Sequence, residues 1–67
     1  MWSTPLQVQD AFSKAKVVSA DRVRFDIGGG VFRLIVAFDF GRGLAFIKFV
    51  GTHAEYDRVD ARTVSRF

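Results

Sequence analysis

The spacing of apolar residues near the start of the chain predicts a short amphipathic helix. Four apolar residues follow the i, i+3, i+4 and i+7 spacing of one helical face: Val8, Ala11, Phe12 and Ala15. Thr4 suits the N-cap position, Pro5 suits the first helical position, and Gln7 completes a capping box. We expect a helix of about three turns that packs against the rest of the chain, because a helix this short is marginal alone.

Beyond residue 21 the pattern changes to strict alternation, which is typical of half-buried strands. Polar and apolar residues alternate through the segment Arg22-Val23-Arg24-Phe25-Asp26-Ile27. Further strands are expected over residues 31–40 and 44–50, with a short one at residues 17–18. Glycine-rich segments at residues 28–30 and 41–43 separate the longer strands, so the sequence predicts two hairpins in series and an antiparallel meander.

The first hairpin is expected to keep its apolar face whole. A two-residue turn sets Phe25 opposite Phe32, whereas a three-residue turn would set Phe25 opposite Arg33. The favoured register also places Arg24 opposite Arg33, and like charges directly across a ladder are unfavourable. An anion bound between the two guanidinium groups would relieve that repulsion. Alternatively, both arginines project into water.

The second hairpin allows two registers. A three-residue turn pairs Phe38 with Phe46 but places Lys48 on the apolar side of the sheet. A two-residue turn places Lys48 opposite Ile35, on the face of the arginines. Because a buried lysine without a partner is costly, we predict the second register.

A second capping box follows the last strand. Thr52 and Glu55 have the required spacing, so a helix of one or two turns is expected to begin there. It carries the only histidine and the only tyrosine of the chain, His53 and Tyr56, at neighbouring positions of one face. An imidazole beside a phenol is a pair of groups suited to proton transfer. The charged segment 57–62 is expected to be solvated, and the tail to Phe67 to fray.

Composition limits the class of protein. The 67 residues, 1–67, are expected to form one domain, and without cysteine neither a disulfide nor a thiolate metal site is available. The net charge of +3 suits a polyanionic partner. Neither a membrane span nor a signal peptide is recognisable, so a cytoplasmic protein without membrane attachment is expected.

The side chains of the predicted sheet and final helix could act on a phosphodiester. The glycine-rich turn lacks the lysine-serine pair of a phosphate-binding loop, and a lone histidine is a poor metal site. RNA cleavage needs a base for the 2′-hydroxyl, cations for the phosphorane and an acid for the leaving oxygen. The candidate groups are His53, Tyr56, Arg24, Arg33 and Lys48. Alternatively, the segment around His53 is only a structural corner between strand and helix.

Three segments carry a family resemblance: Arg22 to Gly29, Phe32 to Ile35, and Phe46 to Asp57. They resemble the HigB-type toxins of bacterial toxin–antitoxin systems, in the RelE superfamily, and the run Thr-His-Ala-Glu-Tyr-Asp at residues 52–57 is the most specific part. Trp2 to Pro5, leading to Phe12, also resembles the helix that precedes the sheet in that family.

The resemblance implies an α+β, RelE-like fold with an N-terminal helix, a three- to four-stranded antiparallel meander and a short C-terminal helix. It implies a toxin that acts as a ribosome-dependent mRNA endoribonuclease without a metal ion or cofactor. It also implies that a helix-turn-helix antitoxin neutralises this toxin. By position, the implied catalytic residues are His53, Tyr56, Arg33 and Lys48. The implied supporting residues are Arg22 and Arg24, as RNA contacts, and Asp57, as an orienting group.

One departure from the family pattern bears on function. Family members carry an initial strand and a helical hairpin before the position of Trp2, and this sequence lacks them. Residues 31–40 are apolar on both faces and need cover on two sides, so we expect an open apolar surface and an open sheet edge. The alternative function is a toxin-like module without RNase activity that binds the antitoxin, or that covers its sheet edge as a homodimer.

Overall fold

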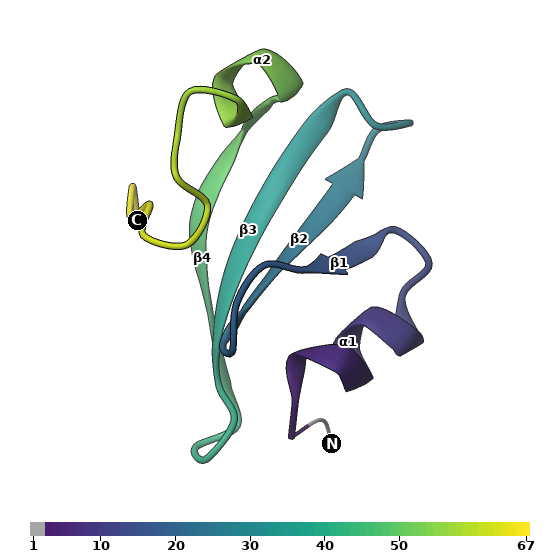
Figure 1. Ribbon diagram of the computed structural model, residues 1–67, viewed down its shortest axis with the longest axis vertical. Coiled ribbons are helices and arrows are strands. Elements are labelled where there is room, and N and C mark those ends of the chain that lie inside the picture. The colour runs from purple at the N-terminus through teal and green to yellow at the C-terminus, as the bar shows by residue number, and fades with distance from the viewer. Residues whose placement is uncertain (1–2) are drawn as a thin grey trace.

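The computed structural model describes residues 3–67, so the predicted role of Trp2 lies outside the described residues. The elements in chain order are α1 (Pro5–Ala11), β1 (Ala15–Val17), β2 (Arg22–Ile27), β3 (Phe32–Asp39), β4 (Leu44–Thr52) and α2 (His53–Tyr56). The strands form one antiparallel sheet in the order β1-β2-β3-β4 (Figure 1). This confirms the predicted α+β fold, with an N-terminal helix, a meander and a short C-terminal helix. Within residues 3–67, no helix is long and apolar enough to cross a membrane.

Helix α1 begins where the sequence predicts and ends earlier. The Thr4 hydroxyl accepts a hydrogen bond from the Gln7 amide at 3.3 Å, and the Gln7 side chain accepts one from the Thr4 amide at 3.2 Å. The helix ends at Ala11, because the chain enters β1 and Ala15 pairs with Phe25. Ala15 is 2% exposed there, so the sheet buries the residue that was expected on the helical face.

The register of the hairpin between β2 and β3 differs from the predicted one. Arg33 lies opposite Asp26, and Arg24 lies opposite Ile35, so the predicted pairing of Arg24 with Arg33 is wrong. The turn spans residues 28–31 and contains three glycines with φ of 60°, 69° and 91°. This left-handed backbone conformation is accessible to glycine without strain and lengthens the turn by two residues. A shift of two leaves every side chain on its predicted face but replaces a repulsive pair with an attractive one.

The hairpin between β3 and β4 contains a β-bulge. Ile35 pairs with Phe49 whereas Val36 pairs with Ile47, so Lys48 is an extra residue without a partner in β3. The predicted register is confirmed between the turn and the bulge, where Val36 pairs with Ile47. Beyond the bulge Leu34 pairs with Val50, so the predicted pairing of Lys48 with Ile35 is wrong. The bulge moves Lys48 out of the ladder, so that Phe49 and Ile47 can fill opposite faces of the sheet.

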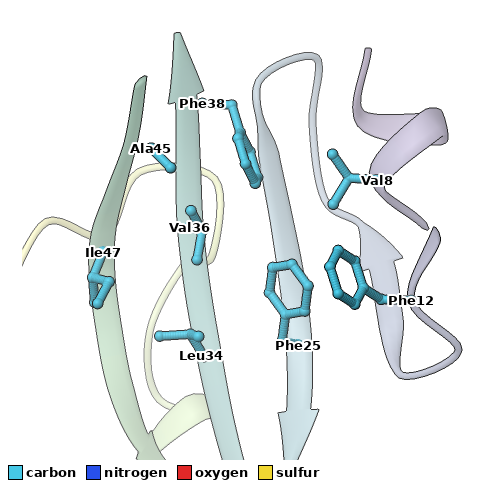
Figure 2. Close-up of a pocket in the computed structure, with 8 residues that line it drawn as sticks. All are labelled: Val8, Phe12, Phe25, Leu34, Val36, Phe38, Ala45 and Ile47. Atoms are coloured by element: carbon cyan, nitrogen blue, oxygen red, sulfur yellow. The ribbon is translucent and has the colours of Figure 1, made fainter. Parts of the chain in front are cut away.

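One face of the sheet, which we call the groove face, carries an open apolar groove of about 430 Å³ (Figure 2). The residues that line it are Val8, Phe12, Phe25, Leu34, Val36, Phe38, Ala45 and Ile47. Helix α1 covers this face beside β1 and β2, and Val8 is fully buried there against Ala15 and Val23. Over β3 and β4 the face is open, and Ile47 is 50% exposed. The expected open apolar surface is confirmed, and its lack of charged side chains makes it unsuitable for a phosphate backbone.

The opposite face, which we call the arginine face, carries Arg22, Arg24, Asp26, Arg33, Ile35 and Phe49. The chain after α2 folds back over this face, so the expected fraying of the tail is wrong. The Arg22 guanidinium donates hydrogen bonds to the carbonyls of Ala61 at 3.1 Å and Val64 at 2.6 Å. The Arg66 amide donates to the Lys48 carbonyl at 2.9 Å. Through these contacts the segment after α2 covers part of the arginine face, whereas α1 covers part of the groove face.

Candidate active site

Helix α2 is fixed at the end of β4 by its cap and by a close approach of the backbone. The Thr52 hydroxyl accepts from the Glu55 amide at 3.2 Å, and the Glu55 carboxylate accepts from the Thr52 amide at 3.0 Å, which confirms the predicted capping box. At Gly51, a Cβ atom would lie 2.7 Å from Cζ of Phe49. Only glycine fits there without displacing that buried ring. The strand therefore enters α2 at a defined angle, and this sets the positions of His53 and Tyr56.

The cap makes the stability of α2 depend on pH. Hydrogen bonds from the Thr52 backbone and side chain lower the pKa of Glu55 below its ordinary value. A carboxyl whose pKa is lowered by folding stabilises the fold above its unfolded pKa, and that contribution is lost as the pH falls through the folded pKa. We expect the melting temperature of the wild type to fall more than that of Glu55→Gln as the pH is lowered from about 5 to about 3. Thermal unfolding followed by circular dichroism checks this, and parallel pH dependences would contradict it.

The Tyr56 ring is held between two side chains of the arginine face. It packs edge-on against Phe49, with ring centroids 6.3 Å apart and an interplanar angle of 61°. The Arg24 guanidinium carbon lies 5.6 Å from the centre of the same ring, a cation–π distance. Since Phe49 is fully buried, the phenol is carried on a rigid support.

Asp26 joins two arginines on that face. Its Oδ1 lies 3.0 Å from Nε of Arg24 and 3.3 Å from Nη1 of Arg33. Nη1 of Arg33 also donates to the Gly30 carbonyl at 2.9 Å. The side chains are 25%, 23% and 12% exposed for Arg24, Asp26 and Arg33. Sequence reasoning missed Asp26 as a site residue, although the alternation of β2 already placed it on the face of Arg24.

His53 is paired with the acidic residue one turn later. Its Nδ1 lies 3.2 Å from Oδ2 of Asp57, and the two side chains are 56% and 60% exposed. The His53 amide donates to the Val31 carbonyl at 3.1 Å, which ties α2 to the glycine-rich turn. The carboxylate can therefore orient the imidazole while the ring stays accessible to a substrate.

The remaining two predicted site residues have partners elsewhere. The Lys48 ammonium lies 5.7 Å from the centre of the Phe46 ring, and Arg22 is engaged by the tail. Of the seven predicted residues, the structure thus joins Arg24 and Arg33 through Asp26, and Arg24 in turn contacts Tyr56. His53 lies on the same short helix as Tyr56 and is paired with Asp57, the C-cap of that helix. Within residues 3–67, no group of histidine, aspartate and glutamate side chains is arranged to hold a metal ion.

Comparison with known proteins identifies the family. A family model described as HigB_toxin, the RelE-like toxic component of a toxin–antitoxin system, matches residues 1–59. The chain belongs to this family of HigB-type toxins. Comparisons with curated proteins and with solved structures found no match.

The family match covers every predicted site residue of this HigB-type toxin, from Arg22 to Asp57. The tail carbonyls that bind Arg22 belong to Ala61 and Val64, which lie after the matched segment. Membership makes the protein a toxin of a toxin–antitoxin system, with an antitoxin as its partner.

Proposed function

We propose that this HigB-type toxin is an endoribonuclease that cleaves mRNA on the ribosome, in the cytoplasm. The observation that carries the proposal is the contact of the Tyr56 ring with the cations of the arginine face. Arg24 lies against Tyr56, Arg33 is linked to Arg24 through Asp26, and the helical turn that holds Tyr56 also presents His53. A phosphodiester on this face would meet positive charge and a proton-transfer group together.

The proposed reaction uses the 2′-hydroxyl of the RNA as the nucleophile. A base takes its proton, the oxygen attacks phosphorus, and cations stabilise the negative charge of the phosphorane. The 5′-oxygen leaves with a proton from an acid, which gives a 2′,3′-cyclic phosphate and a 5′-hydroxyl. We assign His53 and Tyr56 to proton transfer, and Asp57 orients His53 through their 3.2 Å contact.

The cationic roles follow from the same proposal. Arg33 and Lys48 are assigned to the scissile phosphate, and Arg22 and Arg24 to neighbouring RNA contacts. The Arg22 contact requires release from the Ala61 and Val64 carbonyls that now bind its guanidinium. The partner that neutralises the toxin is proposed to be a helix-turn-helix antitoxin.

Induced expression in bacteria tests the proposal. The wild type is expected to arrest growth and to fragment mRNA, and His53→Ala is expected to do neither while accumulating as folded protein. Northern analysis of a translated and an untranslated copy of one mRNA measures the cleavage and its dependence on ribosomes. If the folded wild type is harmless, or if His53→Ala is equally toxic, the enzymatic proposal fails.

The rival function is a module that binds the antitoxin, or a second copy of itself, without cutting RNA. The open groove favours this rival, because Ile47 and Phe12 are 50% and 43% exposed beside it. The expression test separates the two functions, since a binding module leaves mRNA intact.

A further inference from the structure

We infer that Asp26 is a positioning residue of the proposed active site, one that holds Arg24 and Arg33 close together and keeps Arg24 over the Tyr56 ring. The inference rests on the proposed RNase function and deepens it. No residue role assigned above to RNA or to proton transfer includes Asp26.

Arg24 and Asp26 make two contacts on the arginine face. Nε of Arg24 lies 3.0 Å from Oδ1, and Nη2 donates to Oδ2 at 3.4 Å. Only the Nη2 contact has hydrogen-bond geometry, because Nε of Arg24 and Oδ1 of Asp26 are buried without a hydrogen-bond partner. The Nε contact is an ion pair, and together the two contacts hold the guanidinium against the carboxylate. The two residues are separated by one position in β2, so both side chains leave the same face of the strand. The pair is therefore held within a rigid element.

Asp26 also links Arg24 to Arg33 across the sheet. The same Oδ1 that contacts Arg24 lies 3.3 Å from Nη1 of Arg33, which stands opposite Asp26 in β3. Without the carboxylate between them, the two guanidinium groups would repel each other across a half-buried surface. Their separation is thus set by one acidic side chain.

Arg24 connects Asp26 to the Tyr56 ring. Arg24 contacts the Tyr56 ring, so the contacts run from Arg33 through Asp26 and Arg24 to Tyr56. They link β3 and β2 to α2, which is the element that carries the proposed proton-transfer groups. Release of Arg24 from Asp26 would free one side of the Tyr56 ring, and even a small misplacement of a reacting group slows catalysis strongly.

The negative charge of Asp26 distinguishes a positioning role from an RNA-binding role. Asp26 is an acidic residue among cations that are proposed to contact RNA, and its negative charge opposes the approach of a phosphate. Loss of that charge should leave RNA affinity unchanged or raise it, whereas loss of an arginine should lower it. A positioning role therefore predicts that the cleavage rate falls without a loss of affinity.

The test compares two measurements on Asp26→Asn, which keeps the size of the side chain and removes its charge. Single-turnover cleavage of ribosome-bound mRNA at saturating protein is expected to be roughly 10- to 100-fold slower than for the wild type. The dissociation constant for ribosomes carrying a 2′-O-methylated, uncleavable mRNA is expected to be equal or lower. Asp26→Glu, which restores the charge, is expected to recover part of the rate.

The matched control is Asp39→Asn, which removes the acidic partner of Arg42 at the turn between β3 and β4. It should leave the cleavage rate and the dissociation constant unchanged. If Asp26→Asn does not fold, Asp26→Ser tests the same point, because serine also removes the carboxylate and leaves both arginines in place. The same loss of rate without loss of affinity is expected. A wild-type rate in these variants, or a loss of rate matched by an equal loss of affinity, overturns the positioning role. A wild type that cleaves no mRNA overturns the proposed function itself.

Discussion

The variant Tyr56→Phe is expected to cleave ribosome-bound mRNA roughly 100- to 10,000-fold more slowly than the wild type, the usual contribution of a general acid or base. Phenylalanine keeps the ring that packs against Phe49 and lies beneath Arg24, and only the phenolic hydroxyl is removed. The loss is therefore expected in the single-turnover rate, with the dissociation constant for uncleavable mRNA unchanged.

The melting temperature of Tyr56→Phe serves as the control, because an unchanged value shows that the ring still packs. A folded Tyr56→Phe protein that cleaves at the wild-type rate would remove Tyr56 from proton transfer. His53 would then be left as the proposed residue for that role on α2.

The second large effect concerns the buried ring that supports the site. Phe49 is fully buried between β3, the Tyr56 ring and the Arg66 guanidinium, whose carbon lies 4.9 Å from the ring centre. Phe49→Ala is expected to cost about 3–5 kcal/mol, the usual cost of removing a buried aromatic side chain. A single core in a chain this short supplies about the same amount, so the variant is expected to be largely unfolded.

Phe46→Ala is the matched control for this substitution. Phe46 is the same residue type in the same strand, but its side chain is 47% exposed. Its replacement is expected to have a much smaller effect, measured by urea unfolding followed by circular dichroism. Equal destabilisation by the two substitutions would show that the core does not lie where the structure places it.

Local patterns in the sequence predict most elements of this fold, although the short strand expected at residues 17–18 lies at Ala15–Val17. The alternation from Arg22 to Ile27 predicts β2, and the Thr4–Gln7 and Thr52–Glu55 spacings predict both helix starts, because each depends on residues a few positions apart. The family resemblance adds that the protein is a toxin of a toxin–antitoxin system, which the family match confirms.

Features that depend on distant residues are less well predicted. The register of the hairpin between β2 and β3 depends on the backbone conformation of three consecutive glycines in its turn. The bulge at Lys48 depends on side-chain packing on both faces of the sheet. The tail folds onto Arg22 because the Arg22 guanidinium donates hydrogen bonds to the carbonyls of Ala61 and Val64, some forty positions later in the chain. Asp26 was missed for the same reason, since only the correct register brings Arg33 opposite it.

The most direct test of the central claim is the chemistry of the cut ends in a purified translation reaction. With the toxin present, mRNA occupied by ribosomes is expected to be cut, leaving a 2′,3′-cyclic phosphate upstream and a 5′-hydroxyl downstream, and the same mRNA without ribosomes is expected to stay whole. Intact mRNA in the presence of the folded protein, or downstream ends that carry a 5′-phosphate, would contradict the account.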